Sequence, residues 1–198
     1  MTIEQPGASR PSTTTWNPKT AVRAAILVAA WTGLLWLVEG VDFELPADLD
    51  QYGIISRDPD HLLGIVFAPM LHAGFGHLAA NTVPLLVLGF VAAMRSLSRF
   101  ALATLFIVLA SGVGVWVFGP PNTVTVGASG VIFGYFGYVV GRGLFDRRIV
   151  DVVLAGLVAV TYGSILWGVL PDQPGISWQG HLSGLIGGVA AAWLLRKS

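Results

Sequence analysis

The stretch TVGASGVIFGYFGYVVG, residues 125–141, decides the architecture of this chain. Its glycines begin at Gly127 and recur at spacings of 3, 4, 3 and 4 residues up to Gly141, so they lie on one face of a helix. Such a face lets two helices pack closely in lipid. Ser129 opens the run, between Ala128 and Gly130. A hydroxyl group at the end of an apolar helix is a candidate functional group.

The composition around this stretch is that of a membrane protein. The 198 residues are 54% hydrophobic and 11% charged, against about 25% charged residues in typical soluble domains. The mean hydropathy is +0.72. Apolar runs that suit spans of about 20 residues lie near residues 21–38, 78–94, 100–118, 124–140, 150–170 and 180–195. They predict an all-α fold, a bundle of six transmembrane helices in a lipid bilayer.

The N-terminal segment differs from the rest of the chain. Residues 1–20 are rich in Ser, Thr and Pro and predict a disordered cytoplasmic tail, whereas residues 21–198 predict one helical core. The only sizeable connection in this core is a first loop, at about residues 42–76. Within it the run HLLGIVFAPML, residues 61–71, is too short to span and is expected at the interface or against the bundle. The chain has no cysteine, which excludes disulfides and thiol chemistry.

The distribution of Lys and Arg predicts the orientation of the bundle. In a six-span arrangement only Arg57 falls on one side of the membrane. The other side receives Arg10, Lys19, Arg23, Arg95, Arg99, Arg142, Arg147, Arg148, Arg196 and Lys197. Both termini of this cell-membrane protein are therefore expected in the cytoplasm. The formal net charge of 0 gives no reason to expect a nucleic-acid partner.

Three predicted spans place polar residues at one depth. With the N-terminus inside, the second, fourth and sixth spans all enter from the outer face. Their first turns carry His77 and Asn81, Ser129, and His181, in that order. Polar groups inside a membrane are costly and are functional candidates by default. The glycine face of the fourth span, with a similar one on the sixth, predicts that Ser129 and His181 meet near the outer surface.

These residue types suit nucleophilic catalysis. A serine needs a base to take its proton, and a neutral imidazole accepts a proton near neutral pH. His181 is therefore the candidate base for Ser129. His77 and Asn81 lie on one helical face and, with the Ser129 N–H, are candidate donors to an oxyanion. The only acidic residue near these groups is Asp172 in the last loop, so the sequence predicts a Ser-His dyad rather than a triad.

Structural interpretations stand beside the catalytic one. A serine between glycines at a helix start is commonly a capping or packing residue. Ser111, in the middle of the third span, is expected to lie too deep to share the site. Trp178 either walls a substrate pocket or lies at the membrane interface, where tryptophan is common. The spans lack the His-Glu-x-x-His motif of metalloproteases, paired aspartates, and the midplane ionisable residues of transporters.

The ordered motifs resemble those of one family. HAGFGHLAAN at residues 72–81, GASG at 127–130 and GH at 180–181 are similar to motifs of the rhomboid intramembrane serine proteases. The likeness extends over nearly the whole chain from about residue 21. It implies a six-helix rhomboid-like bundle that cleaves the transmembrane segments of other membrane proteins, without a cofactor or metal. In this bundle Ser129 would be the nucleophile, His181 the base, and His77, Asn81 and the Ser129 N–H the oxyanion donors.

The resemblance assigns supporting roles as well. His72 matches a structural histidine of the first loop, which holds that loop by hydrogen bonding. Phe133 stands where relatives often carry an aromatic ring stacked on the catalytic histidine. The motif glycines Gly127 and Gly130, with Trp178, complete the predicted set of structural or pocket residues.

The chain departs from the family pattern at Leu63 and Gly64, where many members carry a Trp-Arg pair. Its first loop is therefore expected to be anchored in a different way. The alternative to the protease is a catalytically inactive rhomboid-like protein that binds transmembrane helices. The presence of both Ser129 and His181 favours the protease.

Overall fold

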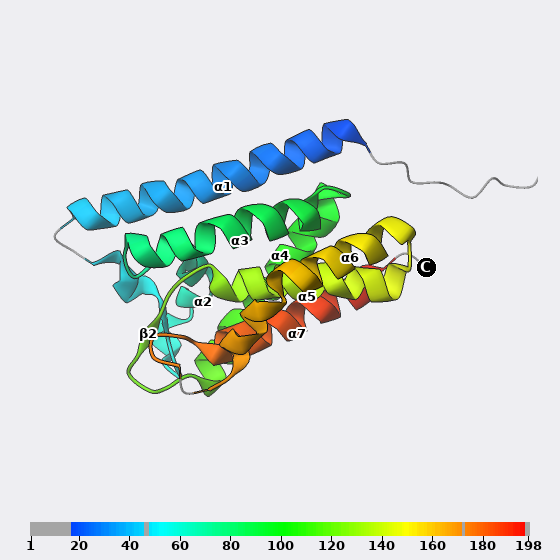
Figure 1. The fold of residues 1–198 in the computed structure, drawn as a ribbon. Helices are drawn as coiled ribbons and strands as arrows, with labels where there is room; N and C mark the ends of the chain where they lie inside the picture. Colours follow the sequence, from blue (N-terminus) through cyan, green and yellow to red (C-terminus); the bar gives the residue numbers. More distant parts are fainter. Residues whose placement is uncertain (1–16, 46–47, 172, 197–198) are drawn as a thin grey trace, which may run out of the picture.

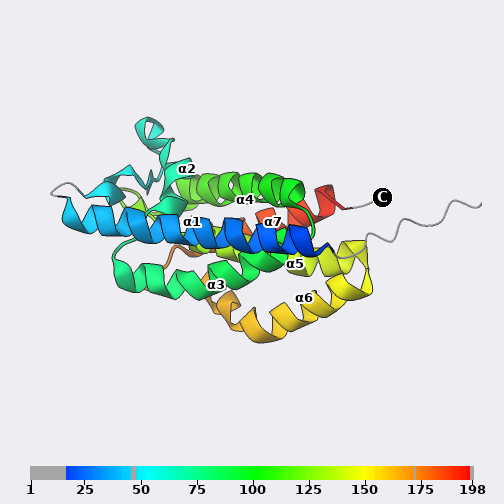
Figure 2. The ribbon, with the colours of Figure 1, turned by 90° about the horizontal axis from the view of Figure 1, so that it is seen from above.

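The computed structural model describes residues 17–45, 48–171 and 173–196. Its long helices are α1 (Pro18–Glu44), α3 (Phe75–Ala93), α4 (Leu97–Phe118), α5 (Ser129–Asp146), α6 (Ile149–Tyr162) and α7 (Trp178–Leu194). The connections contain α2 (Gly64–Phe67), the strands β1 (Ile54–Ile55) and β2 (Val124–Thr125), and the 3₁₀ helices η1 (Leu49–Tyr52), η2 (Pro59–His61), η3 (Ala68–Met70) and η4 (Gly163–Val169). The long helices run side by side, with α1 at one edge in Figure 1 and α6 at one edge in Figure 2.

Helix starts are set by polar caps that precede the apolar runs. The Asn17 side chain accepts from the Lys19 N–H at 3.0 Å, and Pro18 occupies the first turn of α1. Ser96 caps α4 and Ser177 caps α7 in the same way. Three of the helices therefore begin two or three residues before the predicted spans. Residues 1–16 of the predicted tail, 1–20, lie outside the described residues. Residues 17–20 cap and begin α1 instead.

Four helical segments are long and apolar enough to cross a membrane. They are α1, α3, α4 and the continuous segment Ile149–Val169, which joins α6 to η4. Helix α7 has 17 residues, fewer than the ~20 that a span needs, and α5 carries Arg142 and Asp146. The described chain is thus a mostly helical, multi-pass membrane protein. The count of six spans stays a prediction.

A small β-ladder corrects the all-helical expectation. Ile54 and Ile55 of the first loop pair antiparallel with Thr125 and Val124, so the segment predicted to begin the fourth span at residue 124 is a strand. Helix α5 begins later, at Ser129. Between them Gly127 has a φ of +116°, a conformation that favours glycine. The chain therefore turns sharply just before Ser129.

The glycine faces of α5 and α7 meet, as predicted. A side chain on Gly184 would overlap the carbonyl oxygen of Gly130, and one on Gly188 would overlap that of Gly134. A Cβ on Gly141 would lie 2.8 Å from that of Ala192. The backbones of α5 and α7 are thus in direct contact along their length, which is the packing that small residues permit in lipid.

Bonds to the end of α4 anchor the first loop. The Arg57 guanidinium donates to the carbonyl oxygens of Val117 and Gly119, each at 3.2 Å. In return the Trp116 indole N–H donates to the Asp58 carbonyl oxygen at 3.0 Å. These bonds are made by residues other than Leu63 and Gly64, as the missing Trp-Arg pair led us to expect.

The short apolar run of the first loop packs against the bundle. It forms α2 and η3, and Ile65 contacts Gly112 of α4 so closely that a Cβ on Gly112 would lie 3.0 Å from the Ile65 Cβ. Gly64 packs on the Gly53 backbone in the same manner, whereas the Leu63 side chain is 70% exposed. The loop therefore lies over the end of the bundle where α5 and α7 begin.

Candidate active site

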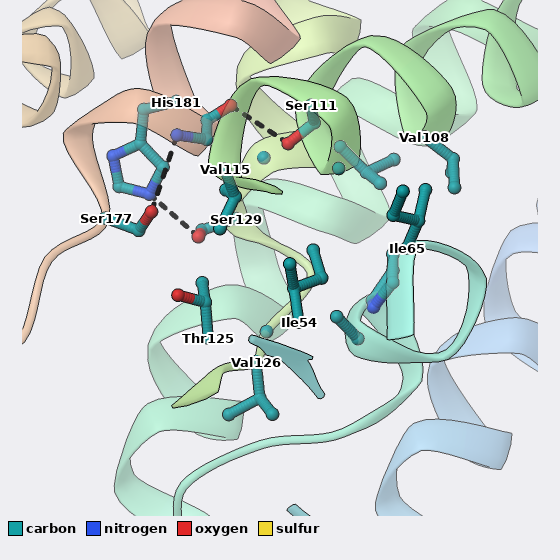
Figure 3. Close-up of a pocket in the computed structure, with 17 residues that line it drawn as sticks. Ile54, Ile65, Val108, Ser111, Val115, Thr125, Val126, Ser129, Ser177 and His181 are labelled. Carbon is teal, nitrogen blue, oxygen red and sulfur yellow. Dashed lines mark hydrogen bonds between the residues drawn. The ribbon is translucent and has the colours of Figure 1, made fainter. Parts of the chain in front are cut away.

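Ser129 and His181 are brought together at the starts of α5 and α7. The His181 Nε2 atom lies 2.7 Å from the Ser129 Oγ atom (Figure 3). His181 is 7% exposed, while Ser129 is half-buried. This distance is that of a direct hydrogen bond, and the contact exists because the two glycine faces let the helices approach.

A backbone carbonyl orients the His181 ring. The His181 Nδ1 atom lies 2.8 Å from the carbonyl oxygen of Gly168, in η4. A carbonyl only accepts, so Nδ1 carries the proton of the neutral ring and Nε2 accepts from the Ser129 hydroxyl. Gly168 also leaves space for the ring, because a Cβ there would lie 3.0 Å from Nδ1. The predicted dyad thus has a third partner that is not acidic, and Asp172 lies outside the described residues.

Phe133 covers one face of the imidazole. Its ring is stacked on His181 with centroids 4.1 Å apart and planes at 11°. Phe133 follows Ser129 by one helical turn, so both side chains project toward α7. Stacking restricts rotation of the imidazole about its Cβ–Cγ bond. It covers the ring face and not the edge, so both ring nitrogens can still form hydrogen bonds.

His77 and Asn81 lie beside the site but do not touch the hydroxyl. The His77 ring lies against Gly127, where a Cβ would be 2.6 Å from the His77 Cε1 atom. Asn81 is 5% exposed, and its amide donates to the His77 carbonyl oxygen at 3.0 Å. The Ser129 N–H, at the first position of α5, has no intrahelical acceptor. The structure thus places His77 against the turn that precedes Ser129 and bonds Asn81 to His77, and the oxyanion role of the three groups stays a prediction.

His72 holds the segment that precedes α5. It is 1% exposed, and its Nε2 atom accepts from the Ala128 N–H at 3.3 Å. Its ring lies edge-on to that of His77, with centroids 5.3 Å apart. Burial, with His77 as a second cause, lowers the pKa of His72 from 6.5 to about 4. His72 is therefore neutral at pH 7 and acts as an acceptor, as a structural histidine of this loop must.

A small pocket of about 30 Å³ opens next to the Ser129 hydroxyl. It is walled by the first loop, α4, α5 and α7. Ile54 and Ile65 of the first loop, with Thr125 and Val126 of the segment before α5, form part of its wall (Figure 3). Gly127 and Gly130 line it as well, whereas Trp178 and Phe133 do not. Trp178 is therefore not a wall of this pocket, and its role at a substrate pocket or at the membrane interface stays a prediction.

Ser111 shares this pocket, contrary to expectation. Its hydroxyl donates to the Gly180 carbonyl oxygen at 2.9 Å (Figure 3), one residue before His181. The expectation that Ser111 is too deep placed the site near the outer ends of the helices. Ser111 lies seven residues, about two turns, before the end of α4, yet it bonds the residue before His181, so the start of α7 lies deeper than the end of α4.

Carboxylates gather elsewhere, in the first loop. Oxygen atoms of Asp42, Asp48 and Asp50 lie within 4.8 Å of one another. Burial, together with the charges of Asp48 and Asp42, raises the pKa of Asp50 to about 6. Exposed acidic groups of this kind are common without a metal, and none of the three lines the pocket beside Ser129.

The comparisons with known proteins agree with this geometry. The family model for the Rhomboid domain matches residues 59–198. An uncharacterized protein of Mycobacterium tuberculosis is 42% identical over 193 residues, which cover 93% of this chain and 80% of that protein. Rhomboid-like protein 11, a chloroplastic protein of Arabidopsis thaliana, is 32% identical over 151 residues, which cover 67% of this chain and 52% of that protein. Rhomboid protease GluP of Bacillus subtilis is 32% identical over 125 residues, covering 62% of this chain and 24% of GluP.

The matched region contains the first-loop histidine, the Ser129 turn and the His181 helix, and it extends over more than half of the chain. The motifs, the α5–α7 packing and the relatives all indicate one assignment: the chain belongs to the rhomboid family.

Proposed function

We propose that the protein is a serine endopeptidase that cleaves transmembrane segments of other membrane proteins. The observation that carries this proposal is the 2.7 Å contact between the Ser129 hydroxyl and His181 Nε2, with His181 Nδ1 bound to the Gly168 carbonyl oxygen. This arrangement gives a weak nucleophile a correctly oriented, unprotonated base.

The reaction begins when Ser129 Oγ attacks the scissile carbonyl carbon and His181 Nε2 takes the hydroxyl proton. The carbonyl oxygen becomes an oxyanion. When the tetrahedral intermediate collapses, the C–N bond breaks and His181 gives its proton to the leaving amine. Water then attacks the acyl group on Ser129, again with His181 as base, and releases the second product.

The Ser129 N–H, His77 and Asn81 are the proposed donors to the oxyanion. Asn81 bonds the His77 carbonyl oxygen in the structure, so its amide must rotate toward the substrate when the oxyanion forms. Such tightening is common, because catalytic hydrogen bonds often form fully only in the complex.

The proposed substrate is a helix with small residues at the cleavage point. The pocket beside Ser129 has a volume of about 30 Å³, enough for a few water molecules at about 10–15 Å³ each but not for a bulky side chain. A helix in lipid satisfies its own carbonyl groups, so the scissile segment must unwind before Ser129 can reach it. Residues that weaken a helix near the cleavage point are therefore expected to favour cleavage.

We also propose that α5 and α7 complete a six-span arrangement, with both termini in the cytoplasm and Ser129 near the outer surface. The support is the distribution of basic residues, which all fall on one side except Arg57. The first loop, anchored on α4, then covers the site from outside, together with the connection before α7.

The function is tested with the purified protein in proteoliposomes and a labelled single-span substrate that has alanine and glycine at the cleavage point. Wild type is expected to cleave it and Ser129→Ala is not. Ser111→Ala is the matched control, since Ser111 lines the same pocket but bonds a carbonyl oxygen. If folded wild type binds the substrate without cleaving it, the inactive helix-binding protein is the correct function.

A further inference from the structure

A second cavity lies near the other end of α5. Its volume is about 300 Å³, and its walls include Arg95, Ser96, Arg99, Tyr138 and Arg142. Arg142 follows Ser129 by 13 residues, about 20 Å along the helix axis. This cavity is therefore separate from the candidate active site, and its chemistry is different.

Two of its arginines are fixed by one buried carboxylate. Asp151 of α6, whose side chain is 1% exposed, accepts from Arg142 at 2.6 Å and pairs with Arg95 through its other oxygen. Arg142 also donates to the Ala92 carbonyl oxygen at 3.3 Å. These bonds hold the two guanidinium groups at the cavity wall.

The third arginine is not fixed in this way. Arg99, in the first turn of α4, is half-buried, and within the described part of the chain no carboxylate or carbonyl oxygen lies within hydrogen-bond distance of its guanidinium. Each guanidinium carries five N–H donors. The Arg99 guanidinium therefore presents donors at this cavity that are not engaged by any hydrogen bond within the described residues.

The residues around the cavity favour an anion. Three arginines, Arg95, Arg99 and Arg142, line it, against one lining carboxylate, Asp146, and the buried carboxylate of Asp151 that bonds two of these arginines. A phosphodiester carries one negative charge. Its unesterified oxygens fit the paired donors of a guanidinium, which is the preferred group for phosphate recognition. The cavity volume of about 300 Å³ far exceeds the ~10–15 Å³ that admits one water molecule, so a phosphate group fits.

Residues next to the cavity place it at the level of lipid headgroups. The end of α7, at Leu195, forms part of the wall. There the Arg196 guanidinium lies 4.4 Å from the centroid of the Trp193 ring, and tryptophan is enriched at the membrane–water interface. Leu194 and Leu144 nearby are 55% and 62% exposed and offer an apolar surface to acyl chains. Basic pockets between membrane helices bind phosphate-bearing headgroups.

We propose that this cavity binds a phosphate group, supplied by the phosphodiester of an anionic phospholipid. The bound headgroup bridges the turn between α3 and α4 to α5 and to the end of α7. Helices α5 and α7 carry Ser129 and His181, so the lipid stabilises the pair of helices from the end opposite the site. A ligand that binds only the folded protein raises its stability by mass action.

The test measures binding directly and is independent of protease activity. The full chain in detergent is titrated with short-chain phosphatidylglycerol, with phosphatidylcholine of equal chain length, and with inorganic phosphate. Thermal unfolding and native mass spectrometry are the readouts. Phosphatidylglycerol is expected to raise the unfolding temperature saturably and to bind at least about tenfold more tightly than phosphatidylcholine, because the choline cation cancels the phosphate charge.

Arg99→Gln is the informative variant, with Arg23→Gln as the matched control. Arg23 is an exposed arginine on α1, so its loss removes the same charge from a place away from the cavity. Arg99→Gln is expected to weaken phosphatidylglycerol binding about tenfold, as loss of charge-assisted hydrogen bonds predicts, and Arg23→Gln less than twofold. If Arg99→Gln does not fold, Arg99→Lys replaces it and is expected to weaken binding several-fold.

The outcomes separate the two sources of phosphate. A shift caused equally by inorganic phosphate and abolished in Arg99→Gln supports the phosphate site and identifies its ligand as soluble phosphate. Equal binding of phosphatidylglycerol and phosphatidylcholine, or an equal loss in Arg99→Gln and Arg23→Gln, overturns the proposal.

Discussion

Helix α5 carries a polar group near each end, and the two ends are built on different physical principles. At its start Ser129 bonds a neutral imidazole, and that imidazole bonds a backbone carbonyl. Near its end Arg142 bonds the buried carboxylate of Asp151, which also holds Arg95. In the first arrangement a proton can move from the neutral hydroxyl to the neutral imidazole. In the second arrangement the guanidinium and carboxylate groups stay charged and hold one another in place. We infer that the first end is suited to chemistry and the second to holding the helices in place.

We call the start of α5, with Ser129, the neutral end and the part with Arg142 the charged end. The largest expected effect is on catalysis at the neutral end. His181→Ala should lower the turnover number for a transmembrane substrate by about 10³-fold or more, since the base is lost, and the protein should still fold. His61→Ala is the control, because His61 lies in the first loop and bonds only Asp58. A His181→Ala variant that cleaves at the wild-type rate would show that another group is the base.

At the charged end the expected effect is on stability. Asp151→Asn leaves two guanidinium groups without their counter-charge, and breaking a buried ion pair in this way costs about 3–5 kcal/mol. Denaturant or thermal unfolding in detergent measures the loss. Asp60→Asn, in the exposed part of the first loop, should change little. If Asp151→Asn is as stable as wild type, the charged end does not lock the helices.

The packing between the two ends gives a smaller effect. Gly184→Ala pushes a methyl group into the Gly130 carbonyl oxygen, and overpacking of this kind costs about 1–3 kcal/mol. It should also separate Ser129 from His181 and reduce the cleavage rate. Gly156→Ala is the matched control on α6, where a Cβ would meet nothing within 4 Å. Equal behaviour of the two variants would mean that the α5–α7 contact does not position the site.

The smallest expected effect is on pH dependence. The pKa of His72 is lowered to about 4 in the folded protein, so between pH 6.5 and 4 the unfolded chain binds a proton that the folded chain does not. The stability that neutral His72 provides is therefore complete above pH 6.5 and is lost as the pH falls through that range. His72→Gln keeps an acceptor for the Ala128 N–H and does not titrate. Its unfolding temperature should fall less than that of wild type between pH 7 and pH 5.

His61→Gln provides the control for this measurement, because that ring is in the exposed loop. Parallel pH curves for wild type and His72→Gln would contradict the assignment of a buried, neutral His72.

Helix positions and the Ser129–His181 pairing could be predicted from the sequence for identifiable reasons. Apolar runs have a length set by the bilayer, and glycines at spacings of 3 and 4 mark a contact face whatever the rest of the fold is. Because Ser129 and His181 both begin such faces, the packing of the faces brings them together. This inference needed no knowledge of the loops.

Other features of the site could not be predicted from the sequence. They depend on backbone groups, which every residue carries, or on contacts between segments that are far apart in the chain. The Gly168 carbonyl that orients His181 has no side-chain signature. The two-residue ladder between β1 and β2 is too short to show a period. The contact of Ser111 with the site depends on how α4 and α7 are placed along each other, which neither segment shows alone.

The most direct test of the central claim is the site of reaction with a fluorophosphonate. The purified protein is labelled in detergent, and the modified residue is identified by peptide mass spectrometry. We predict one adduct, on Ser129, that is absent from folded His181→Ala. A folded wild type that takes no label, or that carries the label on another serine, would contradict the account.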